Sequence, residues 1–131
     1  MDAPFIYVGN NRMKTGKLEA YQQDFMPKLV EVVESNEPRL LAFNVFANEE
    51  GTEIAGVQIH PDADSMLSHM QVMREQITMA YDEYIEATTA IQVYGPPNDA
   101  VLEMIKMMST PGVSVSTKPR HLGGFTRLRS T

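Results

Sequence analysis

The residues from 53 to 70 constrain the fold most, because a strand pattern there runs directly into a helix pattern. Residues 53–60 alternate between two faces, as the side chains of a strand do. One face is made by Ile54, Gly56, Gln58 and His60, and the other by Ala55, Val57 and Ile59. Asp62 is a favourable N-cap and predicts a helix that continues to about residue 84. A strand followed at once by an amphipathic helix predicts a helix layered on a sheet.

The predicted helix carries polar side chains on the flank of its apolar face. That face is made by Met66, Met70, Met73, Ile77, Ala80, Tyr81 and Tyr84. At about 100° per residue, His69 lies about 60° to one side of Met66, and Gln76 about 80° to the same side. We therefore expect His69 to border a cavity lined by methionines of this helix. Histidine titrates near physiological pH, so His69 is a candidate for acid–base chemistry, with a structural role as the alternative.

The whole chain has the order β-α-β-β-α-β. Strand patterns lie at residues 5–9, 40–46, 53–60 and 88–94, and helix patterns at residues 17–35 and 62–84. Pro27 predicts a kink or a broken first segment in the first helix. The order predicts a single α+β domain with a ferredoxin-like, split β-α-β antiparallel sheet. Its core spans residues 1–95. Residues 96–131 add a C-terminal helix capped by Asn98 and an extended arm, of which residues 112–116 are either a fifth strand or part of the arm.

Residues 40–46 are apolar on both sides of the predicted strand. Leu41, Phe43 and Val45 lie on one side, and Leu40, Ala42 and Phe46 on the other. One layer of helices covers only one face of a sheet, so the second face predicts a homodimer that pairs two sheets. The arm ends in Leu122 and Phe125, and we expect it to be ordered and to cross onto the other protomer or cover the mouth of the pocket.

The net charge of −6 argues against a nucleic-acid partner, because phosphates require a basic surface. The acidity lies upstream of a basic tail. The tail carries Lys118, Arg120, Arg127 and Arg129 without an acid, which leaves −10 for residues 1–117. Two alternatives follow: the tail lies on its own acidic surface, or it binds a small anion or an acidic partner.

The chain has no cysteine, which excludes disulfides, thiolate metal sites and thiol nucleophiles. The first residues, Met1 to Val8, carry an acid where a signal peptide needs basic residues, and their apolar run is too short to span a membrane. We expect a cytoplasmic protein without a membrane partner. Ten methionines indicate either flexible core filling or an adaptable apolar pocket.

Three features together resemble the dimeric α+β barrel superfamily, and within it the antibiotic-biosynthesis-type monooxygenases. Lys14-Thr-Gly-Lys17 stands where that family has a polar-Gly-Lys turn before its first helix. Glu37-Pro-Arg-Leu-Leu-Ala-Phe43 stands where it has Glu-Pro-Gly-Cys and a strand. The nine-residue step from His60 to His69 is similar to the family's strand-terminal aromatic residue followed by a helix histidine, although the aromatic residue there is commonly Trp. The resemblance covers about residues 5–95.

The resemblance implies a cofactor-independent monooxygenase that acts on a small aromatic or quinol-like molecule. His69 matches the family's helix histidine and would be the base or a hydrogen-bond partner of the substrate. Asn11 or Asn44 would stabilise the oxyanion that forms. The remaining predicted contacts to the small-molecule ligand are Tyr7, Gln58, Met66, Met70, Met73 and Gln76. The alternative is a non-catalytic, ligand-binding or structural homodimer of the same fold, in which His69 is tied to backbone or solvent instead of converging with Asn11 or Asn44.

No cofactor or metal is expected. Asn11 resembles the asparagine that haem-degrading relatives place near haem, but Met79 stands where those proteins have the ligand histidine. His60, Asp62, Asp64 and His69 also have the chemistry of metal ligands. Asp62 is better explained as a cap, and the set lacks the i, i+4 pairing that holds zinc on one helix face.

Overall fold

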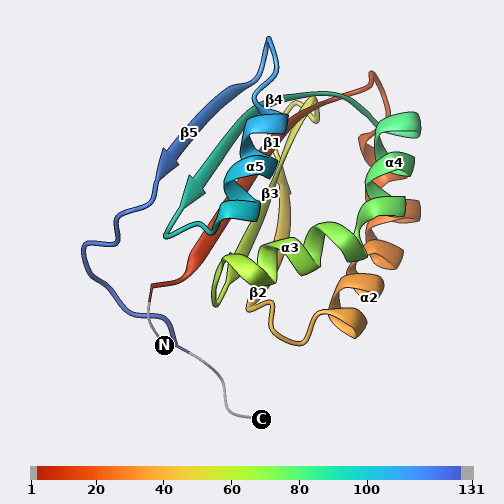
Figure 1. Ribbon diagram of the computed structural model, residues 1–131. Coiled ribbons are helices and arrows are strands. Elements are labelled where there is room, and N and C mark those ends of the chain that lie inside the picture. Colours follow the sequence, from red (N-terminus) through yellow and green to blue (C-terminus); the bar gives the residue numbers. More distant parts are fainter. Residues whose placement is uncertain (1–2, 128–131) are drawn as a thin grey trace.

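The protein is described by a computed structural model over residues 3–127, and its centre is a five-stranded sheet (Figure 1). The strands are β1 (Phe5–Met13), β2 (Ala42–Ala47), β3 (Glu53–His60), β4 (Ile85–Tyr94) and β5 (Ser114–Lys118). Their order across the sheet is β2-β3-β1-β4-β5. All neighbours are antiparallel except β4 and β5, which are parallel. The predicted α+β, ferredoxin-like split β-α-β order is confirmed, with β5 added at one edge.

The helices lie on one face of this sheet (Figure 1). They are α1 (Leu18–Ala20), the π-helical turn η1 (Tyr21–Phe25), α2 (Met26–Asn36), α3 (Ala63–Val72), α4 (Arg74–Glu83) and α5 (Asp99–Met108). The break expected near Pro27 is confirmed, because η1 ends where α2 begins and the proline occupies the first turn of α2, where no backbone N–H is needed. Asp62 and Asn98 cap α3 and α5 as predicted, accepting hydrogen bonds from the Ser65 and Val101 amides.

The single helix expected from residue 62 to residue 84 is wrong, because it divides at Met73 into α3 and α4. Met73 has φ −87° and ψ −3°, at the edge of helical geometry. The backbone stays hydrogen-bonded through the corner, since the Met73 amide donates to the His69 carbonyl at 2.9 Å and the Ile77 amide to the Met73 carbonyl at 2.8 Å. Neither proline nor glycine marks the corner, and Met66, Met73 and Ala80 keep the seven-residue spacing of one continuous helix face.

Two separate apolar clusters form between the helices and the sheet. One is built on α2, α4 and the β1–β4 end that holds Met13, and its buried members are Met13, Tyr21, Phe25, Leu29, Val33, Ile54, Met73, Ala80 and Ile85. The other is built on α3, α5 and the opposite end of the sheet, and its buried members are Phe5, Ala63, Met66, Ile91, Val93, Val101 and Ile105. This division leaves room between the clusters, where the candidate site lies.

The end of the arm does not pack on its own chain. Residues 114–118 are the edge strand β5, but Leu122 and Phe125 are 86% and 80% exposed. They therefore do not cover the mouth of the pocket within the chain, and Arg129 lies outside the described residues. No helix in the part of the chain that the structure describes is long and apolar enough to cross a membrane.

Candidate functional site

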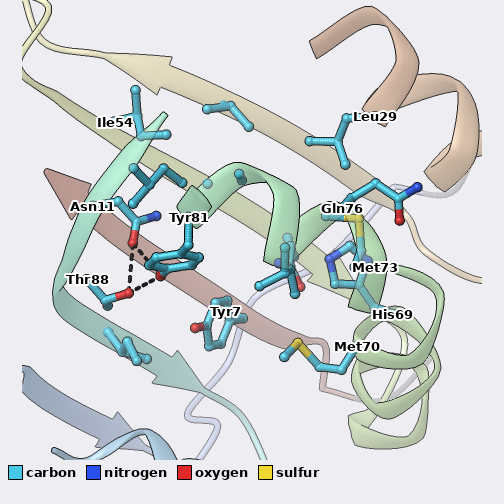
Figure 2. A pocket seen from close by; sticks show the side chains of 18 of the residues that line it. Tyr7, Asn11, Leu29, Ile54, His69, Met70, Met73, Gln76, Tyr81 and Thr88 are labelled. Carbon is cyan, nitrogen blue, oxygen red and sulfur yellow. Dashed lines mark hydrogen bonds between the residues drawn. The ribbon is translucent and has the colours of Figure 1, made fainter. Parts of the chain in front are cut away.

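A cavity of about 430 Å³ lies between the two apolar clusters, lined by residues of the sheet, of η1 and of the helices α2 to α5 (Figure 2). This volume is in the range of small-molecule sites. Its apolar lining includes Tyr21, Phe25, Leu29, Phe43, Val45, Ile54, Ile77, Ile85, Ile91, Met108 and Val113. Five of the lining residues (Tyr7, Tyr21, Phe25, Phe43 and Tyr81) carry Phe or Tyr rings, which suits a flat aromatic ligand.

The floor of the cavity exists because two glycines face each other across neighbouring strands. Gly9 of β1 pairs with Gly56 of β3, and both line the cavity. A Cβ atom added to Gly56 would meet nothing within 4 Å, so the missing side chain corresponds directly to open space. A Cβ atom on Gly9 would come within 3.1 Å of the Tyr7 ring. Glycine in a strand interior commonly marks a site where a ligand or another backbone segment approaches closely. Here the two glycines leave the sheet without side chains at this part of the cavity.

His69 lies in the wall of this cavity and is held by a buried carboxyl group. Its Nδ1 atom is 2.9 Å and 2.8 Å from the two carboxyl oxygens of Glu37. His69 is 1% exposed and Glu37 is 7% exposed, so the pair is almost fully withdrawn from bulk water. Nε2 of His69 has no hydrogen-bond partner among the described residues. Every fully buried side-chain nitrogen or oxygen there has a partner, so Nε2 is accessible and opens to the cavity that His69 lines.

Burial keeps this pair from carrying two opposite charges. It raises the pKa of the Glu37 carboxyl to about 7 and lowers the pKa of the His69 imidazole to about 4. With one proton, the pair is a carboxylate that accepts a hydrogen bond from Nδ1–H, and the Nε2 lone pair faces the cavity. With two protons, the carboxylic acid donates to Nδ1, and Nε2–H faces the cavity. The pair therefore presents a base above about pH 7 and an acid below it.

His60 adjoins His69 and is fully buried, at 0% exposed. The two rings are 5.8 Å apart in an edge-to-face arrangement. His60 Nδ1 lies 2.8 Å from the Ser65 hydroxyl, and Nε2 lies 3.0 Å from Oε1 of Gln58. Burial, and then the nearby His69, lower the pKa of His60 to about 3. His60 is therefore a neutral ring with both nitrogens engaged, and it does not touch the cavity directly.

A second polar group lies at the far end of the cavity. Asn11 Oδ1 accepts hydrogen bonds from the Thr88 hydroxyl at 2.9 Å and the Tyr81 hydroxyl at 3.1 Å, and the two hydroxyls also bond to each other. Figure 2 shows this group at the opposite end of the view from His69. Asn11 and His69 therefore do not converge. We expected His69 to converge with Asn11 or Asn44 in a catalytic site, and to contact backbone or solvent in a binding site. Neither arrangement is present, because the partner of His69 is the Glu37 carboxyl group.

The structure brings most of the predicted site residues to one cavity. Those that line it are His69, Asn11, Tyr7, Gln58, Met70, Met73 and Gln76. The prediction is wrong for Asn44, which is exposed because it alternates with Phe43 and Val45 and so faces the other side of β2. It is also wrong for Met66, which is 0% exposed and packs in the cluster with Phe5.

Sequence reasoning missed Glu37, Tyr81 and Thr88 as polar members of the site. Glu37 ends α2 at its C-cap, and a glutamate is almost never fully buried unless it is paired. Its partner His69 is 32 residues away, so no spacing pattern connects them. Tyr81 was placed on the apolar face of its helix, although its hydroxyl reaches Asn11. Within residues 3–127 no three His, Cys, Asp or Glu side chains gather as a metal-binding group.

Comparison with known families gives no match, and comparison with curated proteins gives none. Solved structures do match. MupZ from Pseudomonas fluorescens aligns with a TM-score of 0.76 at 19% identity, over 97% of this chain and 91% of that chain. A putative antibiotic biosynthesis monooxygenase from Chloroflexus aurantiacus aligns with a TM-score of 0.58 at 17% identity, over 73% and 95%. Another putative antibiotic biosynthesis monooxygenase, from Bacteroides thetaiotaomicron, aligns with a TM-score of 0.56 at 17% identity, over 66% of this chain and 84% of that chain.

The chain shares the fold of these structures. At such identities the likeness concerns the fold alone, and it agrees with the resemblance to the monooxygenases noted in the sequence. The MupZ alignment extends over nearly the whole chain and so includes residues beyond 95, for which the family resemblance offered no counterpart. The α5 and β5 part of the chain is thus shared with at least one solved structure.

Proposed function

We propose that the protein is a cofactor-independent monooxygenase for a small aromatic or quinol-like molecule, with His69 as the base. The observation that carries the proposal is the buried Glu37–His69 pair at the wall of an apolar cavity. A carboxylate that accepts from Nδ1–H fixes the imidazole in the tautomer whose Nε2 accepts a proton. Glu37 is thus a positioning residue, and His69 is the group that meets the substrate.

The reaction begins with removal of a proton from a carbon acid conjugated to a phenol-type oxygen. His69 Nε2 takes the proton, and the carbanion that remains passes an electron to dioxygen. The two radicals combine to a peroxide, whose O–O bond then breaks. One oxygen atom stays as a carbonyl and the other leaves as water, so that CH₂ and O₂ give C=O and H₂O. The substrate supplies all the electrons, and the protein supplies the base and a largely apolar cavity.

The lining of the cavity supports this chemistry. Apolar and aromatic side chains surround His69, with Phe43 packed 5.6 Å from its ring. Burial raises the pKa of the Tyr7 hydroxyl to about 12, so Tyr7 stays neutral and offers a hydroxyl instead of a repelling charge. Asn11, with Tyr81 and Thr88, provides a polar contact for a distal oxygen of the substrate.

The test uses anthrone, a three-ring aromatic ketone with one acidic CH₂ group, and measures oxygen uptake. Wild-type protein is expected to convert anthrone to anthraquinone, and His69→Asn to lose at least about 100-fold in rate, the usual worth of a positioned base. His121→Asn is the matched control, because His121 is exposed on the tail and does not line the cavity. Equal rates in wild type and His69→Asn would refute the proposal. Binding of anthrone without oxygen uptake would favour the non-catalytic ligand-binding function.

We also propose that the working unit is a homodimer joined through the open face of the sheet. Ile6, Val8, Val57 and Ile59 lie on that face, opposite the helices, and Phe46 there is 61% exposed. Sedimentation at micromolar concentration is expected to give twice the chain mass, and Val57→Glu to give the single-chain mass with the cavity unchanged. A wild-type protein that sediments as a single chain would refute the dimer.

A further inference from the structure

Gln58 is a buried amide whose two ends have different surroundings. It lines the cavity and is 7% exposed. Its Oε1 atom lies 3.0 Å from His60 Nε2. The other end of the amide, the NH₂ group, has no hydrogen-bond partner among the described residues. Every fully buried side-chain nitrogen or oxygen there has a partner, so the NH₂ group is accessible. The NH₂ group therefore opens to the cavity.

A chain of hydrogen bonds links this amide to the start of α3. Asp62 caps the helix by accepting from the Ser65 amide at 3.0 Å, which places Ser65 beside His60. The Ser65 hydroxyl lies 2.8 Å from Nδ1 of His60. Because Gln58 Oε1 can only accept, His60 carries its proton on Nε2 and donates to Oε1, and its Nδ1 accepts from the Ser65 hydroxyl. Each donor in the chain meets an acceptor, and the last free donor is the Gln58 NH₂ group.

We propose that Gln58 is the oxyanion-binding donor of this site and that His60 is the residue that aims it. The proposal rests on the proposed function, since the oxyanion is the one that forms when His69 removes a proton. An amide N–H aimed in advance at a developing negative oxygen costs no reorganisation at the moment of reaction. Gln58 and His69 lie at the same end of the cavity, because His60 contacts both of them.

The strand register shows why Gln58 serves this role instead of Asn11. Gln58 pairs with Tyr7 on β1, whereas Asn11 lies four residues further along the same strand. At about 3.3 Å per residue, Asn11 is about 13 Å away from that position. A small aromatic molecule with one oxygen at the Gln58 amide places its other end toward Asn11. The two amides therefore contact opposite ends of one ligand.

The neutral state of His60 is part of the arrangement. The groups that face it are His69, Gln58, Ser65, Asp62 and Arg39. Burial, followed by His69 and Arg39, lowers the pKa of His60 to about 3, and only Asp62 acts in the opposite direction. A protonated ring would donate from both nitrogens, and the Ser65 hydroxyl would then accept from Nδ1–H instead of donating to Nδ1. The neutral ring has only one way to satisfy Gln58 Oε1, which is the Nε2–H tautomer.

The first experiment determines the tautomer of His60 by ¹⁵N NMR of the full chain without ligand. The proposal predicts a neutral ring protonated on Nε2 at neutral pH, assigned by comparison with His60→Gln. A ring protonated on Nδ1 would overturn the proposal. In that tautomer Gln58 would have to donate to His60, and its carbonyl oxygen would face the cavity.

The second experiment uses 4-nitrophenol, whose phenolate form absorbs visible light, as a probe of the bound oxyanion. Wild type is expected to bind the phenolate in preference to the phenol, and Gln58→Leu to lose that preference by at least tenfold. Gln71→Leu is the matched control, because Gln71 is an exposed glutamine of α3 that does not line the cavity. Equal behaviour of the three proteins, including no binding by any of them, would overturn the proposal.

Two variants of His60 separate aiming from mere packing. The amide nitrogen of glutamine reaches the position of Nε2, so His60→Gln is expected to keep the preference for the phenolate. Asparagine is too short, so His60→Asn is expected to lose it even if its melting temperature equals that of His60→Gln. Identical phenolate binding by both variants would contradict the aiming role.

The same proteins distinguish this inference from the proposed function. A wild type that prefers the phenolate through Gln58 but consumes no oxygen with anthrone refutes the monooxygenase and leaves the donor in place. A Gln58→Leu variant that oxidises anthrone at the wild-type rate refutes the donor and leaves the monooxygenase in place.

Discussion

At the scale of residues, the state of the site depends on how many protons Glu37 and His69 share. Removal of one proton from the doubly protonated pair places the remaining proton on Nδ1, against the carboxylate, and frees Nε2. The ionisation that creates the base is thus that of the pair, and its midpoint follows the pKa of about 7 that burial gives to Glu37. The histidine itself stays neutral throughout, because burial lowers its pKa to about 4.

We predict that kcat/KM for anthrone oxidation rises with pH and levels off above the midpoint near pH 7. The sign follows from the pair, because loss of its proton exposes the accepting nitrogen. Glu37→Gln removes the ionisable carboxyl, so the variant should lose this inflection and about 10- to 100-fold in rate. Initial oxygen-uptake rates between about pH 5 and pH 9, corrected for the spontaneous reaction, test this. An unchanged inflection in Glu37→Gln would assign it to another group.

At the scale of elements, the cavity is a consequence of two glycines in paired strands and of a helix that turns at Met73. At the Gly9–Gly56 pair neither strand carries a side chain, whereas at most strand positions a side chain would fill this space in the core. The turn at Met73 brings residues of both α3 and α4 to the same cavity (Figure 2). The C-terminal elements contribute the remaining wall through Met108, Thr110 and Val113.

We predict that larger side chains at Gly56 block the ligand without harming the fold. A Cβ atom there meets nothing within 4 Å, so Gly56→Ala should bind anthrone nearly as wild type does. Gly56→Val and Gly56→Phe should bind progressively worse, by tenfold or more for Phe, while the melting temperature stays equal or rises, since glycine weakens a strand. Isothermal titration and thermal unfolding of the series check this. Wild-type affinity in Gly56→Phe would show that the ligand binds elsewhere.

We predict that two truncations of the C-terminal part have different effects. A chain that ends at Gly95 loses α5 and β5, including the buried Val101 and Ile105 that pack with Phe5. Full burial of each such side chain is worth about 1.5–3 kcal/mol, so this chain should be strongly destabilised. A chain that ends at Lys118 loses Leu122 and Phe125, which are exposed, and its monomer stability should be unchanged. Thermal unfolding decides, and equal melting temperatures of the two truncated chains would contradict the packing described.

At the scale of the whole molecule, the buried titratable groups make stability depend on pH. His60 and His69 have folded-state pKa values of about 3 and about 4, below the ordinary 6.5, so the stability they contribute is present above pH 6.5 and is lost as the pH falls toward those values. Glu37 acts in the opposite direction, because burial raises its pKa from the ordinary 4.5 to about 7. Its contribution to stability is fully present below pH 4.5 and is lost as the pH rises to 7.

We predict that the two histidines outweigh the single carboxyl between pH 4.5 and 6.5, so acidification across that window lowers the melting temperature. Each uncompensated proton contributes about 1.4 kcal/mol per pH unit. His60→Gln removes one histidine and should flatten the dependence. Circular dichroism melts of both proteins across the window provide the measurement, and the account fails if the wild-type melting temperature rises on acidification.

Much of this molecule could be predicted from its sequence, because the informative signals are local. The alternation of residues 53–60, the cap at Asp62 and the break near Pro27 each act over a few residues, and all three are present. The turn at Met73 has no local sequence signal, because neither proline nor glycine stands there. The site was located by the helix flank that holds His69, but its chemistry depends on contacts far apart in sequence. Glu37 meets His69 across 32 residues, and only the fold brings them together.

The central claim is that His69 removes a proton from a ligand in the cavity, and hydrogen exchange without oxygen tests it most directly. Anthrone in D₂O, kept free of oxygen, exchanges the hydrogens of its CH₂ group when a base removes them, and NMR follows the loss of their signal. Wild-type protein is predicted to accelerate this exchange well above the buffer rate, Glu37→Gln to accelerate it less, and His69→Asn to leave it at the buffer rate. Acceleration by His69→Asn equal to that of wild type would contradict the account.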